Sequence, residues 1–176
     1  MPSQEIRTPR ATAFREFCES IMATDSSIRF VGVANKYGTL IESAYRKDLK
    51  PLMDQEETGH YAIQSVFRSS TRETFQSKIG KQRYAIAVYE KLIRATIPII
   101  IIIKDNNSRN YDDDDHNDNK VGEQKKHAEA KQQLQQEQNS RFCLLISFDL
   151  GSEVISIIEN KILPQVEERK HLLLVQ

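Results

Sequence analysis

The most apolar stretch of the chain lies between Arg83 and Lys104 and predicts two consecutive strands. Ile, Val, Tyr and Thr dominate it, and these β-branched and aromatic residues favour strands at 83–90 and 94–104, joined by a tight turn. Side chains alternate between the faces of a strand, so the isoleucine run 99–103 needs apolar cover on both faces. We therefore expect the second strand to lie inside a sheet that is covered on both sides.

The first fifty residues predict a helix followed by a hairpin. Apolar side chains from Phe14 to Met22 recur at i, i+3, i+4, i+7 and i+8, which indicates a helix over 11–24 with one buried face. Strands are expected at 28–34 and 39–45, because the four residues between them open with Asn and close with Gly, as hairpin loops do.

A second helix is predicted over 54–79. Asp54 is a suitable N-cap, and Gly80 stands where a C-cap glycine belongs. Gly59 and the cluster 69–71 weaken the interior, so the pattern also allows a kink or a break. The apolar residues at helical spacing are Ile63, Phe67, Phe75 and Ile79.

The last part of the chain adds a strand and a helix. Strand character resumes at 141–149, and Ser152 is a good N-cap for a helix that Pro164 would break or kink. The tail 171–176 either docks on the core or frays. The expected fold is α/β (α+β): a five-stranded, mostly antiparallel sheet with helices on both faces, in the order α-β-β-α-β-β-β-α.

Composition divides the chain into a leader, a domain and an insertion. Residues 1–10 are expected to be a flexible leader, and 11–176 a single domain. Residues 105–140 interrupt this domain with nine acidic and five basic side chains and few apolar ones. Because such a segment cannot bury enough apolar surface to offset its ordering entropy, we expect it to be disordered or partly helical.

Bulk composition excludes several classes of function. Lysine plus arginine equals aspartate plus glutamate at 25 each, so the net charge gives no reason to expect nucleic acid as a partner. The longest apolar run is far shorter than a membrane helix of about 20 residues, and the N-terminus has no apolar signal-peptide core. Cys18 and Cys143 each lie in an apolar run without a CxxC pattern, which suits a reducing cytoplasm.

No catalytic or metal-binding constellation emerges from the motifs. The acidic run 112–115 fails as an EF-hand loop, because positions 6 and 12 of that frame hold Asp118 and Gln124 in place of Gly and Glu. His116 and His127 have no cysteine with them and do not make up a zinc site. Glycine-rich phosphate-binding motifs are absent from the sequence. We therefore expect a protein that is not an enzyme and has no cofactor or metal.

Basic side chains are the candidate binding residues. If they share one face, they would offer a positive patch to an acidic protein partner or an anion, whereas the alternative is an ordinary solvated helix face. The candidate residues are Arg46, Lys47, Lys50, Arg68, Arg72, Lys78, Lys81 and Arg83.

The order of elements resembles the roadblock and profilin-like group of small α/β domains, to which PAS and GAF sensor domains are structurally related. Three stretches, 28–52, 62–70 and 78–91, are also similar to a family of small archaeal proteins, mostly from ammonia-oxidising lineages. That similarity covers roughly 14–103 and 142–163. It carries over no activity.

The resemblance to roadblock domains implies a cytoplasmic module that forms a homodimer and serves as a scaffold for a partner such as a small GTPase. A PAS or GAF type sensor of a small-molecule ligand is the alternative. It would need a cavity between sheet and helix, and the aromatic residues that suggest one are Phe30, Tyr37, Phe67 and Tyr84. An enzyme on the same scaffold has no support from the motifs.

Overall fold

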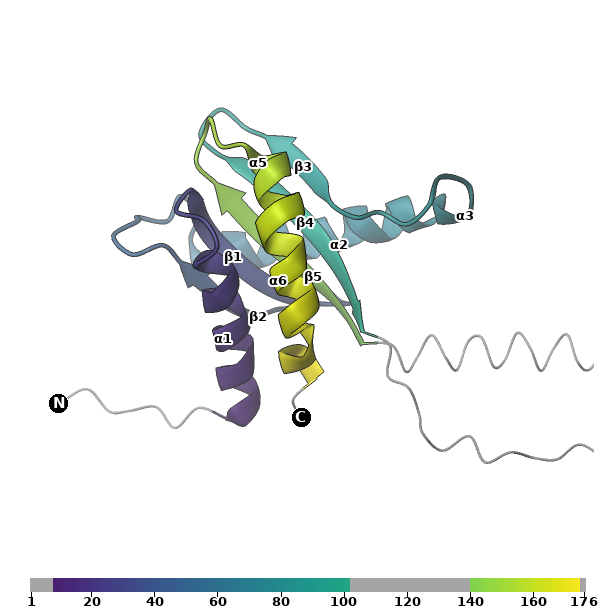
Figure 1. The fold of residues 1–176 in the computed structure, drawn as a ribbon, viewed down its shortest axis with the longest axis horizontal. Helices are drawn as coiled ribbons and strands as arrows, with labels where there is room; N and C mark the ends of the chain where they lie inside the picture. Colours follow the sequence, from purple (N-terminus) through teal and green to yellow (C-terminus); the bar gives the residue numbers. More distant parts are fainter. Residues whose placement is uncertain (1–7, 102–139, 175–176) are drawn as a thin grey trace, which may run out of the picture. The chain divides into compact units, whose positions relative to one another are not determined.

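The computed structural model describes residues 8–101 and 140–174, and their elements follow the predicted order (Figure 1). The chain divides into two units, 1–99 with 141–176 and 100–140, and of the second only 100, 101 and 140 are described. The first three helices are α1 (Pro9–Met22), α2 (Gln55–Glu73) and α3 (Gln76–Ile79). The strands are β1 (Ile28–Asn35), β2 (Leu40–Tyr45), β3 (Ala85–Val88), β4 (Ile93–Ile101) and β5 (Ser140–Phe148). The C-terminal helix consists of α5 (Val154–Ile157), a π-helical turn η1 (Ile158–Ile162), α6 (Leu163–Arg169) and a 3-10 turn η2 (Lys170–Leu174).

The five strands form one sheet in the order β2-β1-β5-β4-β3. β1 pairs antiparallel with β2 and with β5, and β3 pairs antiparallel with β4. The last strand of the chain is therefore the middle strand of the sheet, between the two hairpins. This confirms the predicted architecture of a five-stranded, mostly antiparallel sheet.

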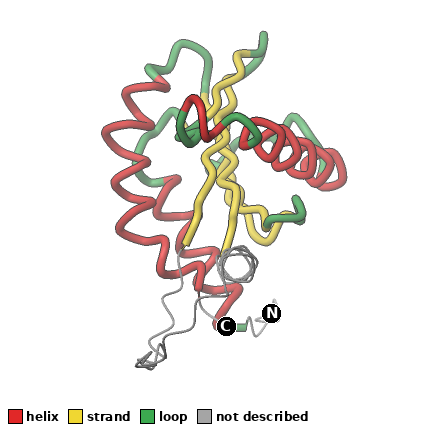
Figure 2. Tube along the Cα trace, turned by 90° about the vertical axis from the view of Figure 1, so that its right-hand side faces the viewer, coloured by secondary structure: helices red, strands yellow, loops and turns green. Residues whose placement is uncertain are grey.

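Helices cover both faces of the sheet. α1 and the C-terminal helix lie on one face, where α1 packs on β1 and β2, and α2 lies on the other (Figure 2). The amphipathic pattern of α1 is confirmed, because Phe14, Phe17, Cys18 and Ile21 are fully buried. α1 begins at Pro9 with Thr8 as its N-cap, so the end of the predicted leader belongs to the helix.

The isoleucine-rich strand β4 lies inside the sheet, between β5 and β3. Its burial alternates at the end, since Ile99 and Ile101 are buried and Ile100 is 37% exposed. Cover is therefore complete on one face of β4 only. Ile102 and Ile103 lie outside the described residues, as does the predicted insertion up to residue 139.

Of the two outcomes predicted for Pro164, a break or a kink, the break does not occur, and the C-terminal helix continues past this residue. The turn before it widens into the π-helical η1, in which the Leu163 N–H donates to the Ile158 carbonyl, five residues back. A proline ring in a regular helix collides with the carbonyl four residues back, so a wider turn accommodates it without a break. The helix then continues to η2, where Leu173 is buried and η2 packs on α1. The tail, at least to Leu174, thus docks on the core.

Candidate interaction surface

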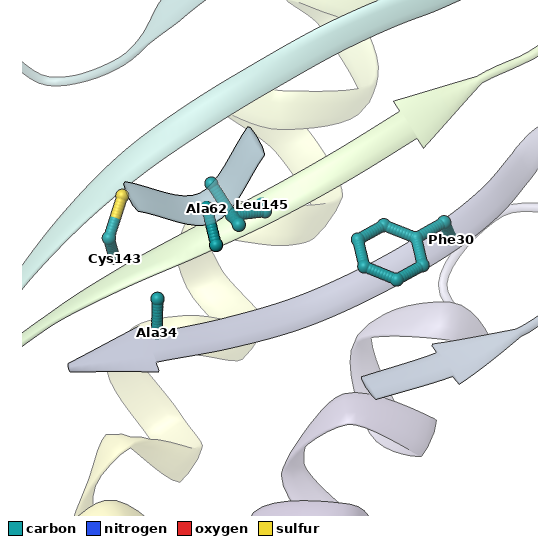
Figure 3. Close-up of a cluster of buried hydrophobic side chains, with 5 residues drawn as sticks. All are labelled: Phe30, Ala34, Ala62, Cys143 and Leu145. Carbon is teal, nitrogen blue, oxygen red and sulfur yellow. The ribbon is translucent and has the colours of Figure 1, made fainter. Parts of the chain in front are cut away.

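The helix α2 buries small side chains and exposes large apolar ones. Its sheet-facing residues recur at helical spacing and are Thr58, Ala62, Ser65 and Ser69. Ala62 is fully buried among Phe30, Ala34, Cys143 and Leu145 (Figure 3). Small side chains allow the helix backbone to approach the sheet closely. The large apolar side chains of α2, which would normally be buried in a core, lie on its outward face.

The exposed residues are those that the apolar periodicity of 54–79 would place against a core. Ile63 is 51% exposed and Phe67 is 72% exposed, and beyond the break at the end of α2 the exposed fractions of Phe75 and Ile79 are 59% and 81%. We call these four residues the apolar set. An isolated exposed apolar side chain is ordinary, but four large ones within seventeen residues of sequence make this segment a candidate for contact with another protein.

The hairpin turn between β1 and β2 lies directly against α2. A Cβ atom on Gly38 would be 2.5 Å from the Ile63 Cα, and the φ angle of Gly38 is +84°. Both the space and the backbone conformation therefore require glycine here. This contact sets how α2 lies beside the turn and keeps the outward face of the helix in one orientation.

The strand β3 forms one edge of the sheet. Within the described residues it pairs with β4 alone, and Ala87 and Val88 at its end are exposed. An edge strand offers unpaired N–H and C=O groups on its outer side, which can pair with a strand of another chain. Val88 is 73% exposed, so the edge also carries apolar surface.

A hollow of about 460 Å³ lies between the segment after β2, the first half of α2 and the β3–β4 turn. Its walls are mostly apolar, with charged groups at Glu90, Lys91 and Arg94. The Arg94 guanidinium stacks on the Tyr61 ring at 3.7 Å from its centroid, and its Nη2 lies 2.7 Å from the Met53 sulfur. We call this the Arg94 hollow. The residues that line it are Leu52, Met53, Tyr61, Tyr89, Glu90, Lys91, Leu92 and Arg94.

The predicted basic residues lie on several elements. Arg46 and Lys50 are in or next to the loop after β2, Arg68 and Arg72 are on α2, and Lys81 is in the loop before β3. Of the other three, Lys47 is also in the loop after β2, Lys78 is on α3, and Arg83 lies just before β3.

Two of these basic residues form ion pairs within the fold. Arg46 donates to both carboxylate oxygens of Asp149, with a shortest N–O distance of 2.6 Å, and Arg83 lies 2.6 Å from Glu159. The hydrogen bond from Arg46, with that from Arg29, lowers the pKa of Asp149. These two arginines therefore join the loops to the C-terminal part of the chain.

The two cysteines lie on opposite faces of the sheet. Cys18 is on α1, and Cys143 belongs to the cluster beneath α2 (Figure 3). Burial raises the pKa of both thiols to about 12, so they are packing residues and poor nucleophiles.

The aromatic residues considered for a sensor cavity are not brought together. Phe30 is in the core cluster, Tyr37 and Phe67 are exposed, and the Tyr84 hydroxyl donates to Glu159. In the part of the chain that the structure describes, no group of three or more His, Cys, Asp or Glu residues could hold a metal ion. No helix in that part is long and apolar enough to cross a membrane. The acidic run 112–115, His116 and His127 lie outside the described residues.

Sequence reasoning predicted β3 as a strand, within 83–90, but missed its position at the edge of the sheet, and it missed the Arg94 hollow. Arg94 opens a predicted buried strand, which gave no reason to single it out. The small residues at 58, 62, 65 and 69 did carry a signal, because they share one helical face and leave the large residues on another.

Solved structures with the same fold have low sequence identity to this chain. Myxococcus xanthus MglB matches with a TM-score of 0.51 at 14% identity, over 98% of this chain and 91% of that chain. The gliding protein MglB from Thermus thermophilus matches with a TM-score of 0.55 at 8% identity, over 98% and 94%. A roadblock/LC7 domain from Streptomyces avermitilis matches with a TM-score of 0.51 at 7% identity, over 90% and 96%. No family model and no curated protein matches the sequence. The chain therefore has the fold of roadblock/LC7 domains.

Proposed function

We propose that this chain is a non-enzymatic interaction module of the cytoplasm that forms a homodimer and holds a partner protein. The observation that carries the proposal is the exposed apolar set on α2 and α3, on a helix that buries only small residues. Such a surface is costly to leave in water, and a second copy of the chain offers the same surface in return. The resemblance to roadblock domains supports a small GTPase as the partner.

The edge strand β3 supports the same proposal. A twofold axis next to β3 would pair this strand with its copy and satisfy its free backbone groups, and both chains would contribute an identical edge. Phe67 and Val88 would each lose exposed apolar surface in such a dimer.

The basic residues outside the internal ion pairs are proposed to contact the partner. Arg72, Lys78 and Lys81 are exposed and lie near the end of α2 and after it. An acidic surface of a partner would complement them, and this contact would weaken with salt. Arg46 and Arg83 already pair with carboxylates and would contribute less.

Sedimentation velocity over a range of concentrations tests the homodimer. The wild type is expected to form a dimer at micromolar concentrations, and Phe67→Glu is expected to shift it to monomer, because a buried unpaired carboxylate is strongly unfavourable. Ile155→Glu is the matched control, since Ile155 is 62% exposed on α5 on the opposite face. A wild type that stays monomeric, or an equal effect of the control, would reject the homodimer.

Capture of purified small GTPases in their GDP and GTP-analogue forms tests the partner class. The double variant Arg72→Glu with Lys78→Glu should lose capture, and the control Lys36→Glu, at an exposed position in the β1–β2 turn, should retain it. A dimer that captures no GTPase in either form would contradict this part of the proposal.

The sensor alternative has less support. The hollow between α2 and the sheet, lined in part by Phe30, Thr58 and Tyr61, has a volume of about 30 Å³, enough for one or two water molecules, whereas pockets for small-molecule ligands start at about 300 Å³. The larger hollows near α2 are open at the surface, which suits contact with a protein.

A further inference from the structure

The Arg94 hollow contains an arginine with a poor hydrogen-bond acceptor. A guanidinium has five N–H donors, and a thioether sulfur is a weak acceptor. Within the described residues, the polar contact that Arg94 makes is with the Met53 sulfur, and no oxygen atom accepts from it. Other arginines of the fold, such as Arg29 and Arg141, are paired with carboxylates.

The surroundings of Arg94 fix the orientation of its guanidinium and partly shield it from water, which favours binding of an anion. The stack on Tyr61 holds the guanidinium plane in place, and the half-buried position reduces its contact with water. A preorganised guanidinium in a mostly apolar site binds a carboxylate in a bidentate manner more strongly than a mobile surface arginine does. Lys91 adds a second positive charge at the rim and Glu90 a negative one, so the charged lining is positive overall.

The rest of the hollow is suited to an apolar side chain. Leu52 and Tyr89 are both about half exposed, at 55% and 49%, and Leu92 forms a buried wall. Their apolar surface would be covered if a large side chain entered beside the carboxylate.

We propose that the Arg94 hollow binds a segment of a partner protein in which a glutamate or aspartate stands next to a large apolar residue. The carboxylate pairs with the Arg94 guanidinium, and the apolar side chain packs on Leu52 and Tyr89. This inference rests on the proposed function as a protein-interaction module and names the chemistry that one of its surfaces recognises.

Two synthetic peptides serve as probes in titrations followed by ¹H–¹⁵N NMR spectra of the full chain. One is acetyl-Gly-Ser-Glu-Leu-Phe-Ser-Gly-amide, and the other has Gln in place of Glu. The glutamate peptide is expected to shift the signals of residues around the hollow and to bind at least about tenfold more tightly than the glutamine peptide.

Matched variants test whether the preference for the glutamate peptide depends on Arg94. Arg94→Gln should abolish the difference between the two peptides. Arg10→Gln should preserve it, because Arg10 also lies over an aromatic ring, 5.7 Å from the centroid of Phe14, but is on α1 on the opposite face of the sheet. Leu52→Glu, at an exposed position of the rim, should weaken binding of the glutamate peptide without disturbing the fold.

Equal affinity for the two peptides, shifts elsewhere on the protein, or a preference that persists in Arg94→Gln would each overturn the inference. Circular dichroism confirms that the variants are folded, and sedimentation of the same samples reports the dimer. A dimer without peptide preference would reject the hollow alone, and a monomer with the preference would reject the homodimer alone.

Discussion

The orientation of α2 can be tested by comparing an inward and an outward substitution. Ala62 is fully buried between α2 and the sheet, in contact with the cluster of Ala34 and Cys143. Ala62→Leu would add three carbon atoms where the helix lies closest to the strands. Phe67→Ala would remove a large side chain from the outward face of the same helix.

The structure predicts a large loss of stability for the inward change and a small loss for the outward one. Overpacking a dense core costs about 1–3 kcal/mol, so Ala62→Leu should lower the free energy of unfolding by that amount. Full burial of a Phe side chain is worth about 1.5–3 kcal/mol. Phe67 is 72% exposed, so it gains less than a third of this burial free energy. Its removal should therefore lower the free energy of unfolding by less than about 1 kcal/mol. The higher helix propensity of Ala offsets part of this loss, by about 0.5 kcal/mol.

Urea unfolding followed by circular dichroism measures both free energies. Both variants should be measured at low protein concentration, because dimer formation would add a concentration-dependent term to the stability of the wild type. Thermal midpoints should agree, at about 2–4 °C per kcal/mol for a chain of this size. If Phe67→Ala costs more than Ala62→Leu in the monomer, then α2 packs on the sheet through its large residues, and the reasoning fails.

Two further predictions concern charge and chain length. The Lys161 and Ser27 hydrogen bonds lower the pKa of Asp25 to about 2 from 3.8, so the stability they contribute is present above pH 3.8 and is lost as the pH falls toward 2. The stability difference between the wild type and Asp25→Asn should shrink over that range in acid unfolding. The exposed turn variant Asp48→Asn is the control, and a pH-independent difference would contradict the assignment. We also propose that 105–140 is an insertion within a single domain. Because β4 and β5 are neighbours in the sheet, replacing 105–139 with a short Gly-Ser loop should leave the thermal midpoint unchanged within a few degrees, and a large loss would show that the segment is part of the fold.

Local periodicity was enough to predict the elements and their order. The spacing from Phe14 to Met22 reflects the helical period directly, and the β-branched run around Ile99 indicates a strand by its composition. The N-cap at Asp54 also follows from local residue chemistry, and Asp54 forms a capping box with Glu57. The break was not predicted at the right place, because α2 continues through Gly59 and 69–71 and the turn comes at 74–75.

Which side of α2 faces the sheet could not be predicted in the same way. Apolar periodicity assigns the large residues to the core, but here the distance between helix and sheet is set by Ala62 and its small neighbours. The Arg94 hollow likewise depends on three segments far apart in sequence, around Leu52, Tyr61 and Tyr89, which only the tertiary fold brings together.

The central place of β5 has a consequence for synthesis. The ribosome releases β1 and β2 first and then β3 and β4, so each hairpin exists before the strand that joins them. Until Phe148 has emerged, β1 and β4 each carry an open edge on the side that β5 will occupy. The pairing of β1 with β5 must also close a loop of more than a hundred residues, which slows folding. A nascent or truncated chain without β5 would thus expose two apolar strand edges at once, the form in which this protein is most prone to aggregate.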